Sequence, residues 1–215
     1  KTLYPVQVNN KWGFIDRDGN HMIPFKYDFA DDFHEGLALV MQQDKLGYIT
    51  KSGETAIPII YDEAESFVNG MAIVSKQDKY GIINRTNATQ VEFLYEEIGS
   101  LESNPILVAD EKAYGYINEK GEQIVPLKYK TAYDFKNGLA IVKDSSGYGM
   151  INSLGQLLIE TKYTWLEPFY KYGICKAKND SAYGLLDMNG GIILPFKYDN
   201  IGALKDSMIL IAKNG

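Results

Sequence analysis

The sequence predicts an all-β protein made of an array of repeats, because one glycine and one tyrosine recur at a fixed period. The glycines have successive spacings of 34, 34, 34, 34 and 35 residues, at Gly13, Gly47, Gly81, Gly115, Gly149 and Gly184. A tyrosine follows each glycine fourteen residues later, at Tyr27, Tyr61, Tyr95, Tyr129, Tyr163 and Tyr198. A period of this length is the signature of a repeat architecture. We therefore expect one continuous array, with units at approximately residues 1–36, 37–70, 71–104, 105–138, 139–173 and 174–215.

Three short apolar segments recur in each unit. The first is exemplified by residues 37–40, the second contains the repeat glycine, as in residues 114–117, and the third ends at the repeat tyrosine, as in residues 123–129. Segments of about 4–7 residues that are rich in Ile, Val, Tyr and Phe are typical of strands rather than helices. The sequence thus predicts six units of about 34 residues, each made of three antiparallel strands.

Two copies of the first strand bear on how the units assemble. Residues 3–8 and residues 208–212 both resemble the first segment of a unit, whereas a closed ring of six units needs only one of them. Propeller blades ordinarily have four strands and about 40 residues or more. We therefore expect an open twisted solenoid, with a small-bladed β-propeller as the alternative.

The turns and strands of each unit have position-specific residues. An Asp or Asn opens the second turn and a glycine closes it in residues 16–19, 118–121, 152–155 and 187–190, which is typical of a hairpin. Proline recurs in the third strand, at Pro24, Pro58, Pro126 and Pro195. Because proline cannot donate to a ladder, the third strand is expected at a sheet edge. A glycine inside every second strand indicates close approach of another backbone.

A polar connector joins each tyrosine to the next unit. Apolar residues lie three apart in it, as with Ala30 and Phe33. This spacing predicts one helical turn with an apolar side. An aspartate follows the repeat tyrosine at Asp28, Asp62 and Asp199, where it could cap the N-terminus of that turn.

Composition excludes some classes of function. The formal net charge is −6 and the pI is about 5.0, which argues against a nucleic-acid surface. No apolar run approaches the ~20 residues needed to cross a bilayer. The chain opens at Lys1 rather than at a methionine, so the lack of a signal peptide says nothing about secretion. One cysteine excludes an intrachain disulfide.

The repeat resembles a known family. Residues 11–16 read Lys-Trp-Gly-Phe-Ile-Asp, and Gly, Ile-Pro, Tyr-Asp-x-Ala and Phe-x-x-Gly-Leu-Ala-x-Val follow in order. This pattern is similar to the bacterial WG (or KWG) repeat, and the resemblance covers residues 3–212. It implies a non-catalytic binding or scaffold module without a cofactor, often in cell-envelope or surface proteins. We therefore expect a protein or a cell-envelope glycan as partner, and an envelope or extracellular location.

Carboxylates of the first connectors are the first candidate binding site. If successive units stack, equivalent connectors align and their acids form a stripe, which comprises Asp28, Asp31, Asp32, Asp62, Glu63, Glu65, Glu96 and Glu97. The stripe could bind a basic partner, or it could be a solvated loop surface that aids solubility. A surface hydrolase that uses a pair of these carboxylates is the alternative function.

An aromatic group and a few isolated residues complete the candidates. Trp165, Tyr170 and Tyr172 cluster where the fifth unit departs from the pattern, and aromatic faces could stack on sugar rings. Cys175 replaces a small apolar residue of other first strands, so packing explains it better than nucleophilic catalysis. Residues 16–20 resemble the start of a calcium loop, but Tyr27 stands where the bidentate Glu belongs. No metal site is therefore predicted.

Overall fold

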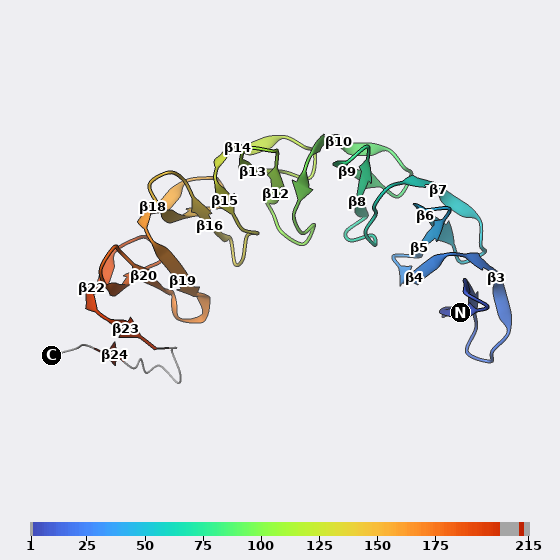
Figure 1. Ribbon diagram of the computed structural model, residues 1–215, viewed down its shortest axis with the longest axis horizontal. Coiled ribbons are helices and arrows are strands. Elements are labelled where there is room, and N and C mark those ends of the chain that lie inside the picture. Colours follow the sequence, from blue (N-terminus) through green and yellow to red (C-terminus); the bar gives the residue numbers. More distant parts are fainter. Residues whose placement is uncertain (1, 203–210, 213–215) are drawn as a thin grey trace. The chain divides into compact units, whose positions relative to one another are not determined.

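The computed structural model describes residues 2–202 and 211–212, and it is built almost entirely of strands (Figure 1). In these residues the 3-10 turn η1 (Tyr170–Tyr172) is the only helical segment. The chain divides into two compact units, Lys1–Glu102 with Glu119–Glu122 and Ser103–Asn118 with Gln123–Gly215. The predicted all-β repeat fold is confirmed.

In the first unit, consecutive strands pair antiparallel in sheets ordered β1-β2-β3, β4-β5-β6-β7 and β8-β9-β10. The strands are β1 (Tyr4–Val8), β2 (Lys11–Ile15), β3 (His21–Tyr27), β4 (Phe29–His34), β5 (Leu37–Gln42), β6 (Lys45–Thr50), β7 (Thr55–Tyr61), β8 (Met71–Lys76), β9 (Lys79–Asn84), β10 (Thr89–Tyr95) and the short β11 (Glu97–Ile98).

The second unit repeats the scheme, with sheets ordered β12-β13-β14, β15-β16-β17-β18 and β19-β20-β21-β22 and the pair β23-β24. The strands are β12 (Ile106–Ala109), β13 (Tyr114–Ile117), β14 (Gln123–Tyr129), β15 (Thr131–Ala132), β16 (Leu139–Lys143), β17 (Tyr148–Asn152), β18 (Leu157–Tyr163), β19 (Trp165–Phe169), β20 (Ile174–Lys178), β21 (Tyr183–Asp187), β22 (Ile192–Tyr198), β23 (Asn200–Ile201) and β24 (Ile211–Ala212). The second copy of the first strand, predicted at residues 208–212, lies outside the described residues except for β24.

At the positions where the sequence predicts a helical turn, the described connectors form strands, bridges or irregular structure, so that prediction is wrong; the 3-10 turn η1 lies elsewhere, in the fifth connector. In β4, Ala30 pairs with Val40 and Phe33 pairs with Ala38, so three steps on β4 match two steps on its partner. This bulge puts residues three apart on one side of a strand. The connector strand β4 thereby adds a fourth strand to the sheet of the following repeat, so the fully described sheets of the array have three or four strands.

Each repeat glycine lies inside a second strand, as predicted, and the reason is steric. Between the Trp12–Tyr27 and Phe14–Ile23 pairs, β2 advances two residues while β3 advances four. The extra length of β3 coils across Gly13, where a Cβ atom would lie 2.6 Å from the carbonyl oxygen of Ile23. A side chain at this position would force the two backbones apart.

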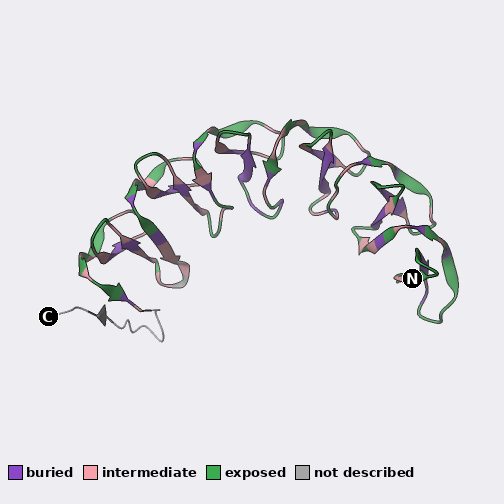
Figure 2. Ribbon diagram, in the orientation of Figure 1, coloured by how far each residue is buried: buried purple, intermediate pink, exposed green. Residues whose placement is uncertain are grey.

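The third strands lie at sheet edges, as the prolines predict. β3, β7, β14, β18 and β22 each end the order of their sheet, and so does β10. Figure 2 shows that these long edge strands are mostly exposed, whereas the central strands are buried. An edge strand has no partner on its outer side, so a proline there does not remove a hydrogen bond from the sheet.

The core lies between successive sheets, and the repeat tyrosines contribute to it. Four of the six repeat tyrosines are buried, namely Tyr27, Tyr61, Tyr129 and Tyr163, whereas Tyr95 and Tyr198 are partly exposed. The Tyr61 hydroxyl donates to the Asn87 side chain at 2.6 Å. In some repeats, a second tyrosine directly follows the repeat glycine, and its hydroxyl donates to the backbone. The Tyr116 hydroxyl, for example, donates to the Tyr133 carbonyl at 2.7 Å.

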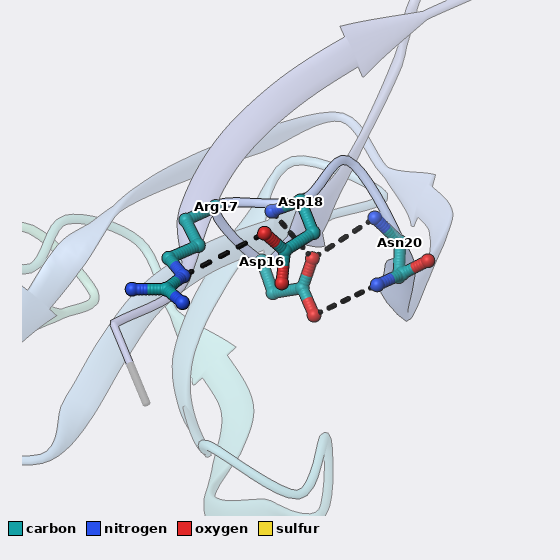
Figure 3. Close-up of polar contacts among 4 residues, drawn as sticks. All are labelled: Asp16, Arg17, Asp18 and Asn20. Atoms are coloured by element: carbon teal, nitrogen blue, oxygen red, sulfur yellow. Dashed lines mark hydrogen bonds and ion pairs between the residues drawn. The ribbon is translucent and has the colours of Figure 1, made fainter.

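The second turn uses its Asp or Asn to hold the hairpin together (Figure 3). The Asp16 carboxylate is 3% exposed and accepts the amides of Asp18 and Asn20, each at 3.0 Å. Asn84 accepts the amides of Thr86 and Ala88 in the same way. These bonds explain the recurrence of Asp or Asn at this position as turn chemistry.

Candidate functional site

Equivalent connectors lie side by side in the first unit. The Ser66 hydroxyl donates to the Asp31 carboxylate at 3.0 Å, and the Gly70 amide donates to the Glu35 carboxylate at 2.9 Å. Each bond joins residues 35 positions apart, so it links one connector to the next. The alignment of the connectors that the sequence predicts is therefore present here, and it brings their acids together.

Four carboxylates of the predicted stripe line one pocket of the first unit. The pocket has a volume of about 210 Å³ and is lined by Glu63, Ala64, Glu65, Ile73, Tyr80, Glu96, Glu97 and Ile98. A second pocket of about 390 Å³ shares Glu65 and Ile98 with it and adds Glu102. We call the two adjoining pockets the acidic groove. No lysine or arginine belongs to the lining of either.

The groove alters the ionisation of its own groups. Partial burial raises the pKa of the Glu65 carboxyl, although its side chain stays open to solvent. The Tyr80 hydroxyl donates to the Glu63 carboxylate, and this bond raises the pKa of Tyr80 to about 12. Neither Glu63 nor Glu65 has an ion-pair partner among the described residues, so the groove carries uncompensated negative charge at neutral pH.

The first acid of each of the first three connectors pairs with a lysine, and one of these acids, Glu96, also lines the groove. Lys11 pairs with Asp28 and Lys45 pairs with Asp62, and Lys79 pairs in the same way with Glu96. The lysine bond and a backbone amide lower the pKa of both Asp28 and Asp62. The predicted stripe therefore contains clamps that hold the repeat together as well as the open carboxylates of the groove.

Sequence reasoning missed these lysines, although a signal for them exists. Lys11, Lys45 and Lys79 stand two residues before the repeat glycine, at intervals of 34 residues. Where Ala113 and Gly147 replace the lysine, Lys130 and Thr164 replace the connector acid, whereas the sixth repeat has Ala182 and keeps Asp199. The joint loss of both partners in the fourth and fifth repeats is the signal for their contact.

The remaining acids of the stripe lie apart from the groove. The Asp31 carboxylate accepts the Ser66 hydroxyl, and its Oδ2 atom lies 3.9 Å from Nε2 of His34. Asp32 lines a separate hollow with Phe33 and Lys51. A larger hollow of about 590 Å³ adjoins the Asp16 turn, but the buried Asp16 carboxylate there is used by the hairpin itself. The groove is thus the one place among the described pockets where several connector acids converge.

The aromatic residues predicted as a sugar platform are not brought together. Trp165 begins β19, whereas Tyr170 and Tyr172 follow its far end, about 16 Å away at roughly 3.3 Å per residue. Trp165 is 37% exposed, and the Lys176 ammonium lies 5.1 Å from its ring centre. The edge of the Tyr183 ring also contacts it, at a centroid distance of 6.1 Å. Trp165 therefore packs against its own sheet.

Cys175 lies in the buried centre of β20, where desolvation raises its pKa to about 12. Such a thiol is not a nucleophile at neutral pH.

His21 packs edge-on against Phe25 in the first unit. In the described part of the chain, no three His, Cys, Asp or Glu side chains are arranged to hold a metal ion. The described residues also contain no helix long and apolar enough to cross a membrane.

Comparison with known families identifies the repeat. The model of the WG containing repeat matches residues 12–45, 47–80, 114–145, 148–181 and 183–215. These matches cover most of the chain, so the protein belongs to the WG-repeat family. None of the curated proteins is significantly similar to it.

Some solved structures are similar to this chain at low identity. A eukaryotic initiation factor matches with a TM-score of 0.50 and 8% identity, over 98% of this chain and 67% of that one, and this likeness concerns the fold alone. Hsv2 from Kluyveromyces lactis matches with a TM-score of 0.43 and 8% identity, over 87% of this chain and 71% of that one. An extracellular domain of a putative hybrid two-component system from B. thetaiotaomicron matches with a TM-score of 0.33 and 13% identity, over 86% of this chain and 32% of that one.

Proposed function

We propose that this chain is a non-catalytic protein-binding module, and that its acidic groove receives a basic extended segment of a partner protein. The observation that supports this most is that Glu63 and Glu65, which have no ion-pair partner among the described residues, line one pocket beside Glu97 and Glu96, the latter paired with Lys79. Uncompensated charge of one sign accelerates association with an opposite charge and selects against partners of like charge.

The division of the groove into two adjoining pockets favours an extended peptide over a small molecule. The pocket with the four connector acids has a volume of about 210 Å³, below the ~300–1,000 Å³ typical of small-molecule sites, and its neighbour has about 390 Å³. Side chains of a peptide could instead occupy the two adjoining pockets in turn. Ala64, Ile73 and Ile98 give the groove apolar walls, against which the aliphatic part of a lysine or arginine can pack.

The glycan and hydrolase alternatives have less support. A sugar platform needs open aromatic faces, and Lys176 lies over the ring of Trp165. A hydrolase needs a cleft that encloses its substrate, which a pocket this small does not offer.

We also infer an envelope or extracellular location from the family resemblance, which fractionation of the native cells would test.

A synthetic peptide of alternating arginine and alanine tests the proposal by isothermal titration calorimetry. We expect the triple variant Glu63→Gln, Glu65→Gln, Glu97→Gln to weaken binding about tenfold or more. The matched control Asp44→Asn, Glu54→Gln, Glu92→Gln removes the same charge from exposed positions outside the groove. We expect it to weaken binding less than about threefold. An equal loss in both variants, or no binding by the wild type, would reject the groove.

A further inference from the structure

A tyrosine hydroxyl binds one connector carbonyl in two of the repeats. The Tyr48 hydroxyl donates to the Glu65 carbonyl at 2.5 Å. In the second unit, the Tyr116 hydroxyl donates to the Tyr133 carbonyl at 2.7 Å. Each of these tyrosines directly follows a repeat glycine, and each bond joins residues 17 positions apart. The bond is therefore a recurring link between a central strand and the connector that follows it.

The third repeat lacks this link. Ile82 stands at the position of Tyr48 and Tyr116, 34 residues from each. Gly99 stands at the position of Glu65 in the next connector. Isoleucine has no hydroxyl, and no donor reaches the Gly99 carbonyl in the part of the chain that the structure describes. Because a main-chain carbonyl is a strong acceptor, this oxygen can take a donor from a bound molecule.

A pocket lies at this carbonyl. Phe67 packs edge-on against the Tyr48 ring at a centroid distance of 4.8 Å, whereas the smaller Leu101 stands at its position in the next connector. Gly99 and Leu101 both line the second pocket of the acidic groove, which has a volume of about 390 Å³. Gly99 also has no side chain that could cover its own carbonyl. A carbonyl without a donor therefore belongs to the wall of a pocket.

The other polar groups of this pocket are acceptors as well. Glu65 and Glu102 supply two carboxylates, neither of which forms an ion pair among the described residues. The Ser100 hydroxyl oxygen accepts the Glu102 amide at 3.2 Å. The apolar walls are Val68, Ile98 and Leu101. A ligand that suits this pocket brings several hydrogen-bond donors on an aliphatic stem.

We propose that the second pocket of the acidic groove is a subsite for an arginine side chain of the bound peptide, and that the Gly99 carbonyl accepts a guanidinium N–H in place of a tyrosine hydroxyl. This inference rests on the function proposed above. A guanidinium carries five N–H donors in a planar fork, so it can serve a carboxylate and a carbonyl at once. A lysine ammonium is a compact, strongly hydrated point charge. The groove should therefore select arginine over lysine.

Two synthetic peptides of equal length and charge, one alternating arginine with alanine and the other lysine with alanine, test the inference by isothermal titration calorimetry. We expect the wild type to bind the arginine peptide about tenfold more tightly. Equal affinity for both peptides, with the triple variant of the groove still weakening both, would overturn the arginine subsite and leave the proposed function intact. Binding of neither peptide would reject both.

The variant Ile82→Tyr tests the role of the Gly99 carbonyl. It supplies the hydroxyl that the third repeat lacks, so we expect the preference for arginine to fall below about threefold. Ile82→Leu brings no donor and is the matched control, which should keep the preference of the wild type. A folded Ile82→Tyr protein with an unchanged preference would overturn the proposed contact.

Glu102→Gln covers the case in which Ile82→Tyr fails to fold, because Ile82 is fully buried whereas Glu102 is exposed. We expect Glu102→Gln to weaken the arginine peptide about threefold or more, since this carboxylate belongs to the second pocket alone. Glu92→Gln removes the same charge from an exposed position outside the groove and should have less effect. The same loss in both variants would overturn the subsite.

Discussion

The absence of a Cβ atom explains why glycine recurs in the second strand of every repeat. At Gly115 a Cβ atom would lie 2.6 Å from the carbonyl oxygen of Val125 and 2.8 Å from the amide nitrogen of Leu127. Both neighbours are backbone, which cannot move aside as a flexible side chain can. The tight coiling of the third strand over the second therefore depends on this residue, and the coiling in turn places the repeat tyrosine over the core.

The repeat tyrosines should contribute strongly to stability. Tyr129 is 5% exposed and packs in a core with Tyr116, Val125 and Ala140. We expect Tyr129→Ala to lower the free energy of unfolding by about 3–5 kcal/mol, as large aromatic deletions do in cores. Urea denaturation measures the change. Tyr133→Ala, at an exposed side chain, is the control and should cost far less. A loss below about 1 kcal/mol at Tyr129 would contradict the packing described.

Cys175 should react only when the protein unfolds. Its side chain is fully buried, and burial raises its pKa to about 12, so little thiolate exists at pH 7. We expect a thiol reagent such as DTNB to label the native protein slowly and to label it fully in concentrated urea. Rapid labelling of the folded chain would show that β20 opens readily and would contradict its central position.

At the scale of the element, the connector shows what the sequence can and cannot reveal. The period, the strands, the edge prolines and the turn chemistry follow from residue type and spacing. The conformation of the connector does not follow from them, because apolar residues three apart fit both a helical turn and a bulged strand. Which one forms depends on the partner strand, as with Ala30 opposite Val40. The same pairing determines where the connector acids lie.

The candidate site was predictable only in part for the same reason. Alignment of the connectors follows from the repeat, so the convergence of Glu63, Glu65, Glu96 and Glu97 on one pocket could be expected. Residues close in sequence, such as Trp165 and Tyr170, were wrongly grouped because an extended strand separates its two ends by about 3.3 Å per residue. In a β-sheet, residues that are paired on neighbouring strands lie close in space, whereas residues several positions apart on one strand do not.

The clamp between Lys45 and Asp62 should make stability depend on pH. The lysine and the Gln77 amide hold the pKa of Asp62 below its usual value near 3.8. A lowered folded pKa stabilises the protein above the unfolded pKa, and that stability is lost as the pH falls through the folded pKa. We expect Asp62→Asn to destabilise the protein at pH 7 and to have less effect below about pH 3.

Urea denaturation of wild type and Asp62→Asn at pH 7 and at pH 3 measures this dependence. The control is Asp44→Asn, at an exposed residue that forms no ion pair in the described structure, and it should change stability little at either pH. The same loss at both pH values for Asp62→Asn would show that the carboxylate charge contributes nothing to the clamp.

At the scale of the whole molecule, one construction principle serves both structure and binding. Connector strands such as β4, β15 and β19 complete the sheets that follow them, and connector side chains also reach a neighbouring connector, as with Ser66 and Asp31. Residues outside these contacts are free to vary from repeat to repeat without loss of the fold. That freedom is how an acidic groove can occupy one part of an array whose framework is the same throughout.

The central expectation for the whole chain is a series of sheets in which each contacts only its neighbours, and small-angle X-ray scattering tests it most directly. A compact protein of 215 residues has a radius of gyration of about 17 Å. The open array predicted from the two copies of the first strand should give a clearly larger value and an elongated distance distribution. A radius of gyration near 17 Å would contradict it and would favour a closed ring.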